Sequence, residues 1–255
     1  MTRSGLARWR GRTALITGAS AGIGEAVATA LAAGGMKIAL TARRADRLEG
    51  LATSIRAAGG EALALPADAR DEAALLAVFD AIRSTWGGVD VLVNSAGLGR
   101  VAPLSSGATD SWREMWEVNV LALSICTREA LADMAARGDD GHVIHISSMS
   151  GHRVPAGRGG MYSATKHAVR ALTEALRREL RRADRSARVT AISPGYVESE
   201  FAEVMLGDPA AATALYSRFP CIQVEDIAEA VRYVLAQPAQ VEIHDILLRP
   251  TRQPT

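Results

Sequence analysis

The chain has 255 residues, of which 48% are hydrophobic, and its formal net charge at pH 7 is +1. This length fits one large α/β domain or two small ones, and the hydrophobic residues can form a sizeable core. The near-neutral charge argues against binding to nucleic acid, so the arginines in segments 8–12 and 176–185 are expected to lie on solvated faces.

Neither a cleavable leader nor a membrane span is expected, because residues 1–12 carry positive charge without a long apolar run. The two cysteines, Cys126 and Cys221, lie outside any metal-ligand spacing and are expected to be packing residues. The histidines form no metal constellation either. These features predict a cytoplasmic protein that binds no metal and no membrane.

Short apolar runs alternate with longer segments of helical periodicity along the chain. Strands are predicted within 13–17, 37–42, 62–68, 89–97, 141–148, 187–195 and 242–250. Helices are predicted within 24–33, 45–58, 71–86, 111–136, 163–183 and 225–236. Strands that are apolar on both faces are typical of parallel sheets with helices on each side. The pattern therefore predicts an α/β fold, a Rossmann-type doubly wound parallel sheet of about seven strands in a three-layer sandwich.

No linker or internal repeat divides the chain, so residues 1–255 are expected to form a single domain. Segment 196–224 contains no predicted strand and is expected to form a small helical lid over the substrate. Ligands of a doubly wound sheet bind beyond the carboxyl ends of its strands. The residues that follow each apolar run are therefore the candidate site residues.

The sequence TGASAGIG at 17–24 follows the first predicted strand and leads into the first predicted helix. Gly18 permits a tight turn, Gly22 lets the backbone approach a pyrophosphate, and Gly24 permits close packing of the helix. The helix N-terminus offers free N–H groups to the anion. The motif therefore predicts a dinucleotide site with contacts from Gly18, Ser20, Gly22, Ile23 and Gly24.

The second predicted strand ends in LTARRADRL at 40–48, with Ala42 where an NAD enzyme usually has an acidic residue. Arg43 and Arg44 follow directly. A guanidinium beside an absent carboxylate suits a 2′-phosphate, through its charge and its planar donor fork. NADP(H) is therefore favoured over NAD(H). The alternative, a solvated basic turn, fits Arg44 or Arg47 better than Arg43.

Two further strand ends are candidates for the rest of the cofactor. Asp68 ends the third predicted strand and Ala69 follows it; the Asp68 carboxylate can accept a hydrogen bond from an adenine amino group. Asn94, Ala96 and Gly97 lie at the end of the fourth, where small residues let the cofactor lie against the sheet. A structural turn explains this last segment equally well.

Six motifs are spread along the chain: TGASAGIG at 17–24, NSAG at 94–97, Asn119 in WEVNVLA, ISS at 146–148, YSATK at 162–166 and SPGYVES at 193–199. In this order they resemble the short-chain dehydrogenase/reductase family in its single-domain form. The resemblance implies an NADP(H)-dependent enzyme acting on CH–OH groups. Such an enzyme transfers a hydride between nicotinamide and a carbonyl or secondary alcohol.

Tyr162 and Lys166 are four residues apart, so a helix places both side chains on one face. By resemblance, Tyr162 is the general acid, and Lys166 is the cation that favours its phenolate, since an isolated tyrosine has a pKa of about 10. Both residues are expected to contact the cofactor as well. Ser148 is expected to hydrogen-bond the substrate oxygen. Asn119 resembles the family's helix-interrupting residue, which holds a proton-relaying water; a side chain bonded to its own backbone is the alternative.

The turn after the sixth predicted strand is expected, by resemblance, to pass the nicotinamide. Backbone groups of Val197 are expected to bind the carboxamide. The full set of contacts expected in this turn is Pro194, Gly195, Val197 and Ser199.

The substrate is expected to be a small, mainly apolar carbonyl compound or alcohol, because the neighbours of the chemistry are mostly apolar. Ketosteroids and dicarbonyl compounds are an alternative class, carried over from one member of the family. The gap between Ser148 and Tyr162 is one residue longer than is usual in the family, which leaves Ser147 or Ser150 as alternatives to Ser148. The predicted substrate contacts are Ser148, Ser150, His152, Tyr162 and Tyr196.

Two other functions share parts of this pattern. A sugar-nucleotide epimerase has the same tyrosine–lysine spacing but needs a longer C-terminal substrate domain. A catalytically silent NADP-binding sensor or structural subunit is expected to lack one of the four catalytic residue types. By resemblance, helices at 111–136 and 163–183 form a contact between subunits, which predicts a homodimer or homotetramer.

Overall fold

Seven strands form one sheet in the order β3-β2-β1-β4-β5-β6-β7 in the computed structural model, which describes residues 5–155 and 159–254. Every neighbouring pair of strands is parallel. The predicted doubly wound fold is confirmed, and all strands except β3, which begins at Glu61, lie inside their predicted runs. The strands are β1 Thr13–Thr17, β2 Lys37–Thr41, β3 Glu61–Ala64, β4 Val91–Asn94, β5 His142–Ile146, β6 Arg188–Pro194 and β7 Asp245–Leu248.

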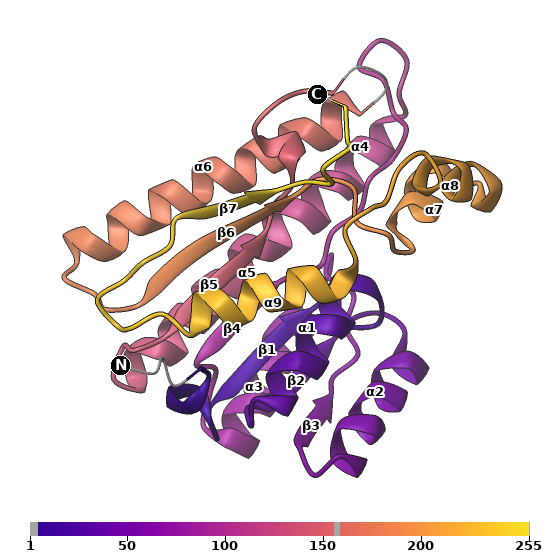
Figure 1. The fold of residues 1–255 in the computed structure, drawn as a ribbon. Coiled ribbons are helices and arrows are strands. Elements are labelled where there is room, and N and C mark those ends of the chain that lie inside the picture. The colour runs from indigo at the N-terminus through magenta and orange to yellow at the C-terminus, as the bar shows by residue number, and fades with distance from the viewer. Residues whose placement is uncertain (1–4, 156–158, 255) are drawn as a thin grey trace.

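Helices cover both faces of the sheet, as Figure 1 shows. One face carries α1 Gly22–Ala33, α2 Ala45–Ala57 and α9 Val224–Leu235. The other carries α3 Glu72–Trp86, α5 Ala122–Ala136 and α6 Gly160–Arg182. Because successive strand residues point to opposite faces, Ile16 belongs to the first core and Leu15 to the second. Burial on both faces explains why the strands read as continuous apolar runs.

The segment predicted as one helix over 111–136 is two helices. α4 Thr109–Trp116 and α5 are joined by a single π-helical turn, η2 Glu117–Leu121. Asn119 lies in this turn and bonds the backbone of Leu98 instead of its own helix. The break therefore serves a contact that helical periodicity cannot reveal.

Segment 196–224 contains two short helices, α7 Phe201–Leu206 and α8 Pro209–Tyr216, which Figure 1 shows standing apart from the two helix layers. Two 3₁₀ turns, η1 Ala7–Trp9 and η3 Met149–Gly151, complete the described elements. Among the residues described, no helix combines the length and the apolar character that a membrane crossing requires.

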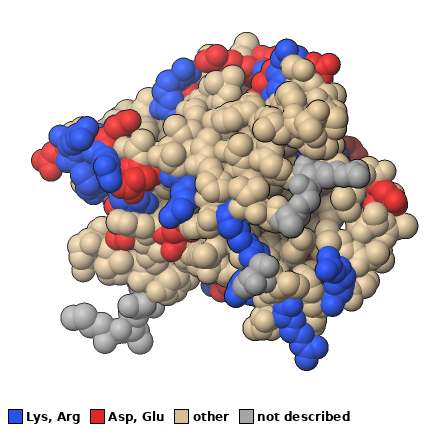
Figure 2. All heavy atoms as spheres, turned by 90° about the horizontal axis from the view of Figure 1, so that it is seen from above, with Lys and Arg blue, Asp and Glu red and all other residues tan. Residues whose placement is uncertain are grey.

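The prediction of solvated arginines in segment 8–12 holds for Arg10, which is exposed, but is wrong for Arg8 and Arg12, which are half-buried. Trp9 is fully buried, and the guanidinium carbons of Arg8 and Arg12 lie 4.9 and 5.1 Å from its ring centroid. Both arginines also pair with Asp140. They cover an aromatic ring and are neutralised by a carboxylate. On the face shown in Figure 2, acidic and basic side chains lie mainly around the margin of a large uncharged area.

Candidate active site

Two adjoining cavities lie beyond the carboxyl ends of the strands. The first, of about 540 Å³, is lined by residues that follow β1, β2, β3 and β4. The second, of about 670 Å³, is lined by residues after β5 and β6, by the start of α6 and by the segment that contains α7 and α8. The residues that line both are Ile23, Ser95, Gly97 and Phe201.

The glycines of the turn between β1 and α1 are required by the backbone conformation at Gly18 and Gly22 and by lack of space at Gly18 and Gly24. Gly18 and Gly22 have φ angles of +67° and +59°, which L-residues rarely adopt. A Cβ atom on Gly18 would lie 2.7 Å from Ala96 Cα, and one on Gly24 would lie 2.4 Å from Gly18 O. The N-cap residue, Ala21, makes no side-chain capping bond, so the first N–H groups of α1 have no side-chain acceptor there. This cradle fits the pyrophosphate of a dinucleotide.

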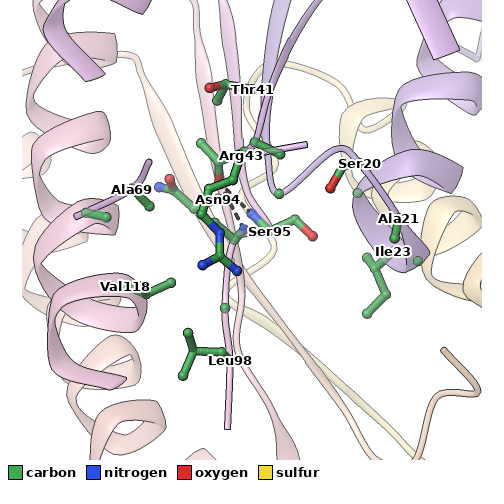
Figure 3. A pocket seen from close by; sticks show the side chains of 18 of the residues that line it. Ser20, Ala21, Ile23, Thr41, Arg43, Ala69, Asn94, Ser95, Leu98 and Val118 are labelled. Carbon is green, nitrogen blue, oxygen red and sulfur yellow. Dashed lines mark hydrogen bonds between the residues drawn. The ribbon is translucent and has the colours of Figure 1, made fainter. Parts of the chain in front are cut away.

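The arginines after β2 have different surroundings. Arg44 donates through Nε to Ser20 Oγ at 3.1 Å, and through Nη1 to Glu200 Oε2 at 2.8 Å. Arg43 is exposed, lines the first cavity, and makes no hydrogen bond or ion pair within the described part of the chain. In Figure 3 it lies between the two walls of the cavity, which are formed by Ser20, Ala21 and Ile23 and by Ala69 and Val118.

Asp68, after β3, lines the same cavity and is already paired. Arg70 Nη2 donates to its Oδ2 at 2.6 Å, and the hydrogen bonds from Arg70 lower the pKa of Asp68 to about 2. The carboxylate is therefore ionised near neutral pH, with lone pairs left for another donor. Asp71 does not line the cavity; it caps α3 by accepting from Ala74 N.

The residues after β4 combine a structural and a lining role. Thr17 Oγ1 accepts from Ser95 N at 3.1 Å and from Ala96 N at 3.0 Å, which fixes the turn against β1. Asn94 is buried and donates to Thr127 Oγ1 at 3.0 Å, yet it also lines the first cavity. Gly97 lines both cavities. The two interpretations of this segment, a turn and a cofactor surface, are thus compatible.

Tyr162, Lys166 and Ser148 line the second cavity together. Tyr162 and Lys166 lie on α6, and Ser148 is the N-cap of η3 after β5. Lys166 Nζ lies 5.8 Å from the centroid of the Tyr162 ring and donates to Ile146 O at 2.8 Å. Ser147 is buried beside Gly151, where a Cβ atom would lie 3.1 Å from its Oγ. Of the three candidate serines, Ser148 is the one whose side chain lowers the pKa of the Tyr162 hydroxyl.

The pKa of Tyr162 differs from the expectation drawn from its neighbour. Burial raises it to about 12, and the hydrogen bond with the Ser148 side chain offsets part of that rise. Burial also lowers the pKa of Lys166 to about 8. Desolvation therefore dominates both shifts, and the ammonium group of Lys166 is directed to the Ile146 carbonyl. Tyr162 is held as the neutral phenol, the form that can donate a proton.

Asn119 is fixed by three hydrogen bonds. Its Oδ1 accepts from Leu98 N at 2.9 Å, and its Nδ2 donates to Leu98 O at 2.9 Å and to Thr165 Oγ1 at 3.0 Å. A Cβ atom on Gly97 would lie 3.5 Å from Asn119 Oδ1 and 3.6 Å from Lys166 Nζ. The Asn119 amide and the Lys166 ammonium group therefore both lie beside Gly97, between the two cavities. The alternative, in which Asn119 bonds the backbone of its own helix, does not describe this side chain.

The wall of the second cavity is mainly apolar. Ser150 and Tyr196 lie in it, as predicted for substrate contacts, beside Met149 and Phe201. The Tyr162 and Phe201 ring centroids are 5.5 Å apart.

His152, predicted as a substrate contact, is turned away from both cavities in this structure. Its Nε2 lies 3.2 Å from Ser193 Oγ and 3.0 Å from Asp245 Oδ2, and it is not among the described residues that line either cavity. The cause is β7, whose first residue, Asp245, provides a nearby carboxylate. The lengthened loop that begins at 151 is described except for residues 156–158, which lie outside the described residues.

The turn after β6 places Pro194, Gly195 and Val197 at the second cavity and Ser199 at the first. Cys126, predicted to be a packing residue, is buried but also lines the first cavity, and burial raises the pKa of its thiol to about 12. No group of His, Cys, Asp or Glu that could hold a metal ion occurs within residues 5–155 and 159–254.

Glu200 and Gln253 are polar residues of the site that sequence reasoning missed. Glu200 lines the first cavity through its ion pair with Arg44, and Gln253 lines the second. Neither has a local sequence signal, because each is held at the site by a residue that is distant in the sequence. Glu200 pairs with Arg44, which is 156 residues away, and Gln253 bonds Tyr196, which is 57 residues away.

Comparison with known proteins identifies relatives over the whole chain. Residues 12–208 match the family described as short chain dehydrogenase. The chain is 52% identical over 260 residues to human dehydrogenase/reductase SDR family member 11, covering 100% of both. It is 39% identical to farnesol dehydrogenase of Aedes aegypti, covering 95% of this chain and 97% of that one.

Two solved structures have the same fold and different cofactors. A closed form of serine dehydrogenase complexed with NADP+ superimposes with a TM-score of 0.89, at 33% identity and over 95% of this chain and 96% of that chain. A short chain dehydrogenase/reductase from Burkholderia phymatum in complex with NAD has a TM-score of 0.85, at 28% identity and over 94% and 89% of the two chains. The choice of cofactor therefore depends on the local residues of each protein.

Proposed function

The chain belongs to the short-chain dehydrogenase family of oxidoreductases, and from this premise we propose that it is an NADP(H)-dependent carbonyl reductase or alcohol dehydrogenase. The observation that carries the proposal is the arrangement of the two cavities. Tyr162, Lys166 and Ser148 line one of them, the glycine turn lines the other, and four residues are common to both. A cofactor in the first cavity and a carbonyl compound in the second would meet beside Gly97.

The residues have distinct roles in carbonyl reduction. When bound, a nicotinamide cofactor supplies the hydride. Tyr162 donates its phenolic proton to the carbonyl oxygen, and Ser148 hydrogen-bonds that oxygen as its negative charge grows. Lys166 stabilises the tyrosinate that remains. Asn119 positions the first turns of α6, since it bonds Thr165 Oγ1, which in turn donates to Tyr162 O at 2.7 Å. We also assign it the family's role of holding a water near Lys166.

The cofactor preference is assigned to Arg43. Its guanidinium lines the first cavity and has no hydrogen-bond or ion-pair partner among residues 5–155 and 159–254, whereas Arg44 is held by Ser20 and Glu200. A 2′-phosphate would give Arg43 a charge-assisted bidentate partner. Asp68 and the turn after β4 are proposed to contact the adenosine part of the same cofactor.

Arg43→Ala should weaken NADPH binding by about ten- to a hundredfold, because a hydrogen bond between charged groups is lost. NADH binding should change little, since NADH has no 2′-phosphate. Fluorescence titration with both cofactors measures the difference. Arg47→Ala is the matched control, because Arg47 is exposed on the same segment but is outside the residues that line the cavity. Equal loss of NADPH and NADH affinity in Arg43→Ala would contradict the assignment.

The proposed substrate is a mainly apolar carbonyl compound or secondary alcohol. Met149, Phe201 and Met205 give the second cavity its apolar wall, and α7 and α8 are proposed to act as its lid. The test is NADPH oxidation by the purified protein with a panel of diketones, quinones, aromatic aldehydes, isoprenoid aldehydes and ketosteroids. Turnover of apolar members supports the proposal. Tight NADPH binding without turnover of any member would favour a silent NADP-binding protein.

We also propose a homodimer or homotetramer. Trp116, Leu121 and Leu172 are large apolar side chains that are 40%, 56% and 37% exposed on α4, η2 and α6. These elements provide the face at which a second copy would bury apolar surface. Light scattering on the purified protein measures the assembly.

A further inference from the structure

The segment after β7 turns back over the active site. Figure 1 shows it running from β7 to the region where α6 begins. Gln253 N donates to Pro250 O at 3.1 Å, which closes a turn. Thr251, Arg252 and Pro254 are exposed in this segment, whereas Gln253 is only 8% exposed. One polar side chain of the segment is therefore directed inward.

Gln253 accepts a hydrogen bond from a backbone N–H group that the sheet leaves unpaired. The ladder between β6 and β7 ends where Gly195 N donates to Leu248 O at 2.8 Å. The next amide, Tyr196 N, donates to Gln253 Oε1 at 3.1 Å. Without this acceptor the partly buried Tyr196 N–H would have no partner among the described residues, and leaving a donor unpaired where water has limited access is costly.

The other end of the same amide group contacts the catalytic segment. Gln253 Nε2 lies 3.6 Å from the Sδ atom of Met149, the residue that follows Ser148. Gly195 allows this approach, because a Cβ atom there would lie 2.3 Å from Gln253 Oε1 and 3.1 Å from Met149 Sδ. The Gln253 side chain thus joins the turn after β6 to the turn after β5. Met149, Gly195, Tyr196 and Gln253 all line the second cavity.

We propose that Gln253 is a positioning residue for the substrate cavity, holding Tyr196 and Met149 in register beside Ser148. This inference rests on the proposed function, since its effect on turnover requires a carbonyl substrate in that cavity. Gln253 acts through the two wall residues and takes no part in the proton transfer.

Gln253→Met keeps the length of the side chain but removes the acceptor for Tyr196 N. The Michaelis constant for the carbonyl substrate should rise by about tenfold, the effect of losing one hydrogen bond to a partly buried backbone donor. The affinity for 2′,5′-ADP should stay unchanged, because that ligand fills only the far end of the first cavity. Gln253→Glu retains an acceptor for Tyr196 N, so its Michaelis constant should stay close to that of the unaltered protein. An equal rise in the Michaelis constant of Gln253→Met and of Gln253→Glu would overturn the proposal.

Hydrogen exchange provides a readout that does not depend on activity. In Gln253→Met, backbone amides in peptides that span 195–206 should exchange about tenfold faster than in the unaltered protein. The matched control is Gln237→Leu, because Gln237 is also buried and donates to a backbone carbonyl, Tyr233 O, at 2.7 Å after α9. That change should leave 195–206 unaffected. Unchanged exchange rates in Gln253→Met would contradict the positioning role of Gln253. This test needs no substrate turnover, so its outcome is independent of the proposed function.

Discussion

Tyr162→Phe should reduce carbonyl turnover by about 10²- to 10⁴-fold, the usual contribution of a positioned general acid. The change removes one oxygen atom and keeps the ring, which packs 5.5 Å from the Phe201 ring, so the cavity should keep its shape. NADPH affinity should fall little, because the glycine turn and Arg43 are proposed to hold most of the cofactor. Steady-state kinetics and a fluorescence titration on the same preparation separate the two effects.

The same substitution at a second phenol of the cavity provides the control. Tyr216 also lines it, but it has no cation one helical turn away. Tyr216→Phe should therefore change the Michaelis constant, while turnover stays within about tenfold. If Tyr162→Phe retained turnover at the level of Tyr216→Phe, the proton donor would have to be another group.

The parts of the site that were predicted from the sequence depend on short-range geometry. Gly18, Gly22 and Gly24 are recognisable because a tight turn between a strand and a helix excludes side chains at fixed spacings. Tyr162 and Lys166 are recognisable because a spacing of four places them on one helical face. The strands are recognisable because both faces of the sheet are covered, which makes each run apolar throughout.

The parts that were not predicted depend on contacts between distant segments. His152 was assigned to the substrate from its place in the loop, but Asp245 of β7 takes it away from the cavity. Glu200 pairs with Arg44 and leaves Arg43 to the cavity, but this pairing is visible only when the segment before α7 is placed beside the turn after β1. Gln253 reaches Tyr196 because β7 pairs with β6 in parallel register, and no local pattern encodes that register.

Lys166→Met should lower kcat/KM for carbonyl reduction by about 10- to 10³-fold. A cation close to a phenol lowers the pKa of that phenol by about one to three units, and each unit corresponds to a factor of ten. The ammonium lies 5.8 Å from the Tyr162 ring centroid, so methionine, with no charge, leaves the developing tyrosinate unstabilised. Lys37→Met is the matched control, because Lys37 is the only other lysine in the chain and pairs with Glu61 at 3.3 Å.

The pH dependence shows whether Lys166 acts through its charge. Its pKa is lowered to about 8, so the cation is present below that pH and is lost as the pH rises through it. Reduction also needs the proton of Tyr162, whose pKa of about 12 keeps the phenol neutral over this range. In the unaltered protein kcat/KM for reduction should therefore be level at low pH and fall above about pH 8. In Lys166→Met it should be low and level between about pH 6 and 10. A fall above pH 8 that persists in Lys166→Met would mean that a different group titrates there and that Lys166 stabilises α6 rather than the tyrosinate.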